Sequence, residues 1–416
     1  MKKIALLSFV FIFAASGLHA RQQDDVQERL KALEERIRAL EAELTLLKAA
    51  QAAPAPAAPV APQVAQAPPV TPGPAPAQLP VYSGAAAAMS KVFNPDMGVI
   101  GNFIGAAGRN TINPFPSLSL QESEVSLQAI VDPYARADFF LALGEEGIEV
   151  EEGYLTFPAI PGGFVSKVGK MRAAFGRVNS FHNHSLPWVD RPLVTFNLLG
   201  GSLEEADIGI KDAGFSVSRI LPSPGGLFFE ATGEVYRGDS GTLFESHRRS
   251  DVSVVGRLRS YADLTEATNL EVGGSFARGH NDLGSDFLTQ VYGFDATLRW
   301  KPLRRAIYRS FAARAELVWS RRGELGLTQR AFGWFGSAEY RLGRRWFVAG
   351  RYDWTERARD ASQHDSGGSL VLTYWPSEFN QIRGQLRRTR YAEGRTANEF
   401  LFQFLFTIGA HGAHPF

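Results

Sequence analysis

The sequence has no cysteine among its 416 residues, and this absence excludes two classes of protein. A small disulfide scaffold and an enzyme with a catalytic thiol both need cysteine. The net charge is only +1 at pH 7, so electrostatics alone indicate no nucleic-acid partner. No apolar run reaches the roughly 20 residues that a membrane-spanning helix needs, so any passage through a membrane has to use β-strands.

The first residues have the pattern of a secretory signal. Met-Lys-Lys is basic, the stretch from Ile4 to Ala15 is apolar, and a cleavage point follows Ala20. The apolar stretch is too short to anchor the chain in a membrane. We therefore expect residues 1–20 to be a signal peptide and the rest of the chain to be exported.

Residues 21–51 carry the heptad pattern of an α-helical coiled coil. Seven apolar residues follow one another at alternating spacings of four and three: Val26, Leu30, Leu33, Ile37, Leu40, Leu44 and Leu47. In a parallel pairing, the flanking pairs that face each other between chains carry opposite charges: Arg29 with Glu34, Arg36 with Glu41, and Glu43 with Lys48. We expect a short periplasmic coiled coil that joins copies of the chain, with a lone amphipathic helix as the alternative.

Residues 52–82 are rich in proline and alanine, with ten prolines between Ala52 and Pro80. Proline lacks the backbone N–H that helices and sheets use, so this segment should be an extended linker. It is either a spacer behind the coiled coil or a disordered linker without a role of its own.

From residue 83 to residue 416 the chain alternates between apolar and polar residues in short segments that end at turn signals. We count sixteen segments, including 163–177, 205–220, 305–321, 366–376 and 396–409. One set of connections is tight, such as Asp132-Pro133 and Pro302-Leu303-Arg304, and the other set is mostly longer and more polar. An even number of strands with short turns on one side is typical of a bacterial outer-membrane barrel.

The last segment indicates which face is apolar. Its alternate positions are Phe400, Phe402, Phe404, Phe406 and Ile408, and the other face includes Glu399, Gln403 and Thr407. A charge on the lipid face of a barrel costs about 2–4 kcal/mol at the bilayer midplane, so charged residues should point into a wet lumen. The sequence therefore predicts an all-β fold, a 16-stranded antiparallel transmembrane β-barrel behind the signal peptide, coiled coil and linker. A soluble two-layer β-sandwich is the alternative.

Ten charged residues on inward faces are predicted to line the pore: Glu149, Glu151, Lys170, Arg172, Arg314, Glu316, Arg351, Asp353, Arg383 and Arg387. The first two lie on one strand, and the next two lie on the following strand. We expect these acidic and basic pairs to oppose each other across the pore, where they would select for charged or polar solutes.

The longest connection, residues 178–204, is too apolar to extend into water. We expect it to fold against the barrel wall from inside and to narrow the channel. His182 and His184, followed by Asp190, offer imidazole and carboxylate groups that could bind a metal ion. The alternative is that these side chains form hydrogen bonds that fix the loop to the wall.

Three stretches resemble a family of bacterial outer-membrane proteins. They are Phe93-Asn94-Pro95-Asp96-Met97, the run from Gly169 to Arg177, and His182-x-His184-x-x-Pro187 followed by Asp190-Arg191-Pro192. That family is similar to phosphate-selective porins of the O/P type, and some members are labelled zinc-regulated outer-membrane receptors. The resemblance implies a water-filled, trimeric, passive channel. The lysine clusters of a phosphate-selective pore are absent, and so is the plug domain of a TonB-dependent receptor.

Taken together, the sequence predicts a porin through which small hydrophilic or charged solutes diffuse. It would sit in the bacterial outer membrane, contact lipid, and form a homotrimer through its barrel and its periplasmic coiled coil. No enzyme activity and no cofactor are expected, since no Ser/His/Asp spacing supports a catalytic site. The alternatives are a structural anchor that tethers the envelope to peptidoglycan through the coiled coil, and a metal-related uptake channel.

Overall fold

The computed structural model describes residues 95–144, 147–201, 208–223 and 227–409, together with Lys31 and Arg38. Lys31 and Arg38 are helical and exposed. Apart from these two residues, the predicted signal peptide, coiled coil and linker lie outside the described part of the chain. Within that part, no helix is long and apolar enough to cross a membrane.

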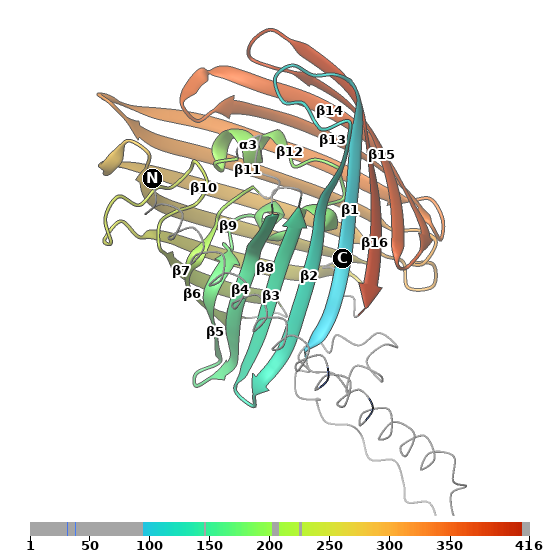
Figure 1. The fold of residues 1–416 in the computed structure, drawn as a ribbon, viewed down its shortest axis with the longest axis horizontal. Coiled ribbons are helices and arrows are strands. Elements are labelled where there is room, and N and C mark those ends of the chain that lie inside the picture. Colours follow the sequence, from blue (N-terminus) through green and yellow to red (C-terminus); the bar gives the residue numbers. More distant parts are fainter. Residues whose placement is uncertain are drawn as a thin grey trace, which may run out of the picture. The chain divides into compact units, whose positions relative to one another are not determined.

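Sixteen antiparallel strands form a closed barrel, in which each strand pairs with its neighbours in the sequence and β1 pairs with β16 (Figure 1). The strands are β1 (Asp96–Arg109), β2 (Leu118–Asp132), β3 (Ala135–Gly144), β4 (Gly147–Ile160), β5 (Phe164–Arg172), β6 (Lys211–Leu221), β7 (Phe228–Tyr236), β8 (Ser253–Thr265), β9 (Thr268–Asn281), β10 (Gly284–Trp300), β11 (Phe311–Glu324), β12 (Leu327–Arg341), β13 (Trp346–Arg357), β14 (Asp360–Ser377), β15 (Asn380–Arg390) and β16 (Thr396–Gly409). Closure leaves no open sheet edge, as a lipid environment requires. The predicted 16-stranded antiparallel barrel is confirmed, and the two-layer sandwich is excluded.

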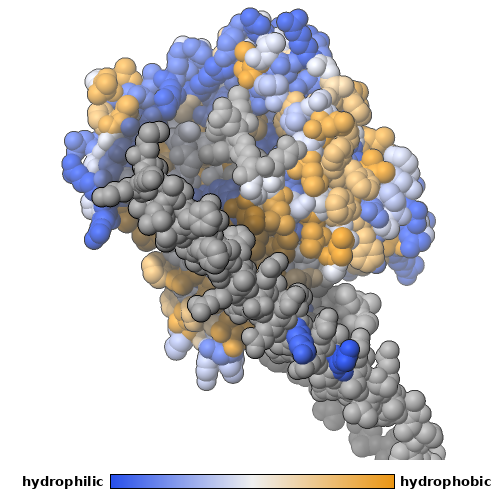
Figure 2. Space-filling view, in the orientation of Figure 1, coloured by the Kyte–Doolittle hydropathy of each residue, from blue (hydrophilic) through white to orange (hydrophobic). Residues whose placement is uncertain are grey.

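Apolar side chains of the strands point out of the barrel. On β16, Phe400 is 45% exposed and Phe404 is 37% exposed, whereas Leu401 between them is fully buried. On β15, Leu386 is exposed and the next residue, Arg387, is buried. Figure 2 shows apolar residues, in orange, gathered in patches over the visible wall, with hydrophilic residues concentrated along the upper rim. The predicted outward orientation of the last strand is confirmed.

The loop between β5 and β6 is longer than the sequence indicates. β5 ends at Arg172 and β6 begins at Lys211, so the loop expected at residues 178–204 extends from residue 173 to residue 210, and we call it loop 3. The Asn179 side chain donates to the carbonyl oxygen of Ile210, and its Oδ1 accepts from the N–H of the same residue. The carbonyl oxygen of Ile210 also accepts from the N–H of Ala173 at 2.9 Å, so the strand pairing continues for one more bond before the chain turns into the loop.

Two expectations about the other connections are wrong. The turn expected at residues 302–304 extends to Ser310, because the N–H groups of Arg305 and Tyr308 form successive turns and β11 begins only at Phe311. Several connections at the loop 3 end of the barrel are tight rather than long, as three terminal strand pairs show: Asn281 with Gly284, Glu324 with Leu327, and Arg357 with Asp360. Polar residues that the sequence assigns to loops continue the strands at these places.

Loop 3 lies inside the barrel. Its described residues include η1 (Val178–Ser180), η2 (Asn183–Ser185) and α3 (Leu193–Leu198), and α3 packs against β11 to β14 (Figure 1). Backbone N–H groups of the loop donate to inward-facing side chains on well-separated strands: Ala174 to Glu234 on β7, Val178 to Glu316 on β11, and Val189 to Gln385 on β15. Since these strands lie around the circumference, the loop crosses the interior.

The apolar residues of loop 3 form a dry core with part of the inner wall. Trp188 packs edge-on against Phe335 of β12, with ring centroids 5.4 Å apart, and both side chains are almost fully buried. Small apolar residues at inward positions complete this core, among them Val255, Ala277, Val291 and Val318. The lumen expected to be wet therefore has a dry part under the loop, because the apolar side chains of the loop exclude water there.

Candidate functional site

Asp190 anchors the middle of loop 3 to the inner wall at β13 and β15. Its carboxylate lies 3.0 Å from Arg351 Nη2 and 2.9 Å from Arg387 Nη1, and it accepts a hydrogen bond of 2.6 Å from Gln385 Nε2. Burial alone would raise the pKa of Asp190, but the two guanidinium groups and this hydrogen bond outweigh burial and lower it. The ionised carboxylate is therefore the stable form.

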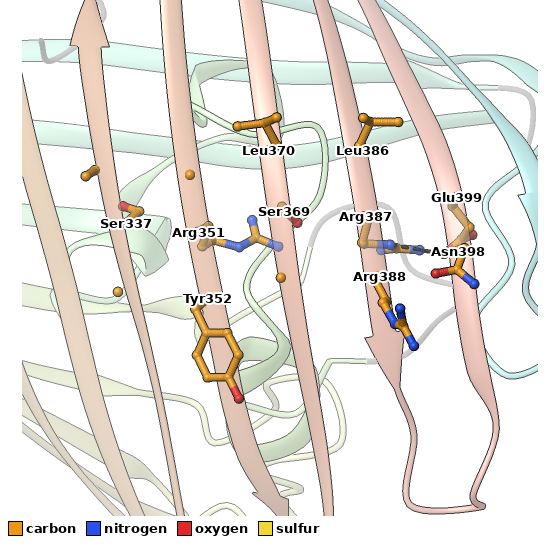
Figure 3. Close-up of a pocket in the computed structure, with 14 residues that line it drawn as sticks. Ser337, Arg351, Tyr352, Ser369, Leu370, Leu386, Arg387, Arg388, Asn398 and Glu399 are labelled. Atoms are coloured by element: carbon orange, nitrogen blue, oxygen red, sulfur yellow. Dashed lines mark hydrogen bonds and ion pairs between the residues drawn. The ribbon is translucent and has the colours of Figure 1, made fainter.

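The two arginines that hold Asp190 each have a second carboxylate partner. Arg351 Nε lies 2.8 Å from Asp353 Oδ2, and Arg387 Nη2 lies 2.6 Å from Glu399 Oε2. The Arg351 guanidinium also lies over the Trp188 ring, 4.9 Å from its centroid. Figure 3 shows Arg351, Arg387 and Glu399 at one level of the wall, on separate strands. Each charged side chain of this anchor therefore has at least one partner of opposite charge, with two arginines shared among three carboxylates.

Arg383 of β15 binds the backbone of loop 3. Its Nη1 donates to the carbonyl oxygens of Leu186 and Trp188 at 2.7 and 3.1 Å, and to Gln403 Oε1 at 2.7 Å. Four of the residues predicted to line the pore point into the barrel but lie beneath loop 3, each at most 4% exposed: Arg351, Asp353, Arg383 and Arg387. In the structure they hold the loop.

Glu316 of β11 anchors the start of loop 3. Its Oε1 accepts hydrogen bonds of 2.6 Å from the N–H of Arg177 and from that of the next residue. Gly176 has a φ of 59°, and a Cβ at this position would lie 2.9 Å from Glu316 Oε2. Only glycine fits both the backbone conformation and the close carboxylate.

Two further residues of the predicted pore set are also engaged in contacts. Arg172 is buried, and its Nη1 donates to the carbonyl oxygens of Asn179 and Ile208 at 3.3 Å. Arg314 on β11 lies 3.7 Å from Glu339 Oε1 of the neighbouring strand. Arg172 joins the end of β5 to two points of loop 3, and Arg314 pairs with a neighbour along the wall.

Six largely buried residues meet where loop 3 passes β2 and β4: Glu122, Glu124, Glu151, Glu152, His182 and His184. We call them the Glu-His cluster. His182 Nδ1 lies 2.8 Å from Glu124 Oε2 and 2.7 Å from Glu151 Oε2, and its Nε2 lies 2.8 Å from Glu152 Oε2. Burial alone would lower the pKa of His182, but the hydrogen bonds to three carboxylates outweigh burial and raise it well above its usual value.

Two β-bulges, one in each of the strands that carry these glutamates, place adjacent residues on the inner face. The pairing of β3 with β4 skips Glu151, so both Glu151 and Glu152 face inward although they are adjacent in the sequence. The pairing of β1 with β2 skips Gln121, beside the pair formed by Asn102 and Glu122, and Asn102 Nδ2 donates to Gln121 Oε1 at 3.0 Å. An unbroken alternation would turn one residue of each adjacent pair outward.

Glu149 and Lys170 lie side by side on the wall. Lys170 Nζ is 3.3 Å from Glu149 Oε1, and Lys211 Nζ is 2.9 Å from the same oxygen. These three residues line a cavity of about 750 Å³ that also reaches Glu122 and Glu151. The expectation that these charges oppose each other across the pore is wrong, because β4 and β5 are neighbours in the barrel and their charges pair along it.

The structure brings together only part of the metal-candidate set. His182 and His184 meet in the Glu-His cluster, whereas Asp190 pairs with arginines at β13 and β15. The reasoning from sequence missed Glu122, Glu124 and Glu152. The two-residue spacing of Glu122 and Glu124 was an available signal, since it puts both on one face of β2. Glu152 faces inward only because of the bulge.

Comparisons with known proteins show which proteins this chain is similar to. No family model matches the chain. An uncharacterized protein of Aquifex aeolicus is 30% identical over 354 residues, which cover 75% of this chain and 73% of that protein.

Among solved structures, the outer-membrane channel DcaP of Acinetobacter baumannii has a TM-score of 0.51 at 11% identity, covering 76% of this chain and 96% of that one. An anion-selective porin from Comamonas acidovorans has a TM-score of 0.50 at 13% identity, covering 76% and 97%. OmpT of Vibrio cholerae in its trimer form has a TM-score of 0.50 at 11% identity, covering 76% and 99%. The chain therefore belongs to the same family as the Aquifex aeolicus protein, and its barrel has the fold of outer-membrane porins.

Proposed function

We propose that the protein is an outer-membrane channel through which small hydrophilic or charged solutes diffuse passively, and that loop 3 narrows its path. The observation that carries this proposal is the opposite character of the two faces of the closed barrel. Exposed apolar residues such as Phe400 and Leu386 cover the outer face, whereas the inner face carries charges of both signs. This is the arrangement of a barrel with lipid outside and water within.

Loop 3 supports the second part of the proposal. It crosses the interior and is tied to the wall through Glu316, Asp190 and His182, so it occupies space that an open barrel would leave to water. The cavity beside Glu149 and Lys170 leaves a polar compartment next to it. Solutes would pass along such charged surfaces, which favour polar over apolar molecules.

The proposed location and assembly draw on different observations. The signal-like N-terminus and the barrel fold support residence in the outer membrane. The heptad pattern of residues 21–51 supports a homotrimer or another homo-oligomer, and Vibrio cholerae OmpT, which shares the barrel fold, is described in a trimer form.

Planar-bilayer recording with the purified full chain tests the proposal. We expect discrete conductance steps, with a reversal potential in a salt gradient that reports the preference for anions or cations. The heat-dependent shift of a folded barrel on a denaturing gel serves as the folding control. Folded protein that inserts into the bilayer without giving conductance steps would overturn the channel proposal.

A further inference from the structure

We propose that Glu122, Glu124, Glu151 and His182 form a binding site for a divalent transition-metal ion, of the kind represented by Zn²⁺ and Mn²⁺. The ion would connect loop 3 to β2 and β4 from inside the barrel. This proposal does not depend on conduction, because a barrel of any function could contain such a site.

The geometry of the four side chains carries the proposal. One possible ligand atom from each of them lies within 4.8 Å of all the others. Glu122, Glu124 and Glu151 are 2 to 3% exposed, so their carboxylates have left bulk water. The four residues come from β2, β4 and loop 3, which are separate in the sequence. The fold, and not the local sequence, therefore brings them together.

Glu122 is an independent indication that a ligand belongs here. Neither of its carboxylate oxygens has a hydrogen-bond partner, although the side chain is almost completely buried. Its Oε1 lies 3.6 Å from His184 Nδ1, an ion-pair distance. Arg191 interacts electrostatically with Glu122 and Glu151, but this does not give the two oxygens of Glu122 a hydrogen bond. Burying a carboxylate in this way is costly, and coordination to a cation would remove the cost.

The donor atoms select the class of ion. One imidazole nitrogen with carboxylate oxygens suits Zn²⁺ or Mn²⁺, whereas Ca²⁺ prefers ligands that are all oxygen. Only Nδ1 of His182 faces Glu124 and Glu151, because its Nε2 lies 2.8 Å from Glu152 Oε2. A metal-bound histidine typically donates its other ring N–H to a carboxylate in this way, which fixes the ring.

An ion can reach the site from the polar cavity. Glu122 and Glu151 line the cavity of about 750 Å³, together with Glu149 and Lys211. Two of the proposed ligands therefore face this polar compartment, while Glu124 and His182 lie behind them.

The experiment measures binding of Zn²⁺ and Mn²⁺ by isothermal titration calorimetry, with the folded full chain in detergent after treatment with a chelator. We expect one saturable site per chain and at least tenfold weaker binding in Glu122→Gln, Glu151→Gln and His182→Gln. Glu149→Gln is the matched control, since Glu149 lies on the same strand and the same cavity but outside the four ligands, and its affinity should match wild type.

Each outcome decides the matter. If the wild-type chain shows no saturable metal binding, the site is overturned whether or not the variants fold. The site is also overturned if Glu149→Gln and Glu151→Gln weaken metal binding equally, because that would indicate a diffuse acidic surface. Stronger binding of Ca²⁺ than of Zn²⁺ and Mn²⁺ would overturn the assigned class of ion. The gel shift of the folded barrel confirms which variants are folded.

Discussion

Loop 3 meets buried carboxylates at two places, and their charges are matched very differently. At β13 and β15, Asp190 has two arginine partners, and each arginine has a further carboxylate. In the Glu-His cluster, four carboxylates meet two imidazoles, and both oxygens of Glu122 lack a hydrogen-bond partner.

Because their buried carboxylates are paired so differently, we interpret the Asp190 anchor as a structural contact and the Glu-His cluster as a candidate binding site. A matched buried ion pair is complete within the folded chain, and removing one partner leaves a charge uncompensated. Glu122 is buried in a cluster beside Arg172 and Arg191 but accepts no hydrogen bond at either carboxylate oxygen, so it would gain from a cation that coordinates those oxygens. The two places should therefore respond in opposite ways when a carboxylate is neutralised.

The largest expected effect is at the matched anchor. Asp190→Asn should lower the free energy of unfolding by about 3–5 kcal/mol, because it removes the shared partner of Arg351 and Arg387 in a fully buried setting. Urea unfolding of the barrel in detergent measures the change. Asp239→Asn is the control, since Asp239 is partly exposed and its partners are the exposed Arg237 and the N–H of Ser246. If Asp190→Asn lowers the free energy of unfolding no more than Asp239→Asn does, the proposed role of Asp190 as a charge-paired anchor is contradicted.

Neutralising the unmatched carboxylate should have the opposite sign. In a chelator, Glu122→Gln should raise the free energy of unfolding by about 1–2 kcal/mol, because it removes a buried charge that has no hydrogen-bond partner. The same urea unfolding measures it, with Glu149→Gln as the exposed control. If Glu122→Gln lowers the free energy of unfolding as much as Asp190→Asn does, the Glu-His cluster and the Asp190 anchor do not differ in the way described.

The pH dependence sharpens the comparison further. The pKa of Asp190 is lowered in the folded protein. Its contribution to the free energy of unfolding is therefore fully present above the ordinary carboxyl pKa of about 3.9, and it disappears as the pH falls through the lowered pKa. The stability gap between wild type and Asp190→Asn should thus stay constant between about pH 5 and 8. Unfolding at several pH values tests this, and a gap that shrinks within that range would contradict the lowered pKa.

The smallest expected effect concerns the exposed pair in the cavity. Lys170→Met should change stability by less than about 1 kcal/mol, because its partner Glu149 is more than half exposed and water screens the pair. In the proposed channel, however, losing this positive charge should shift the reversal potential towards cation preference. An unchanged reversal potential would mean that solutes do not pass Lys170.

The barrel itself follows from the sequence, because a period of two is a direct consequence of strand geometry. The alternation from Phe400 to Ile408 predicts both the strand and its outward face, and the same reasoning holds at Leu386 and Arg387. Strand ends are less predictable where polar residues continue a strand, as at Asp360.

The interior site is less predictable than the wall. Alternation indicates that Arg351 and Arg387 face inward, but nothing local shows that Asp190, far away in the sequence, binds both. The pairing of His182 with Glu152 depends on a one-residue bulge, which reverses the face that simple counting gives. Contacts made by a long loop and a bulge are set by the whole fold.

The most direct test of the account compares the single-channel conductance of the wild-type barrel with that of a variant in which residues 183–200 are replaced by a short Gly-Ser segment. If loop 3 narrows a water-filled path through the barrel, the folded variant should give larger conductance steps than wild type. Equal or smaller steps from a folded variant would contradict the central claim that loop 3 sets the width of that path.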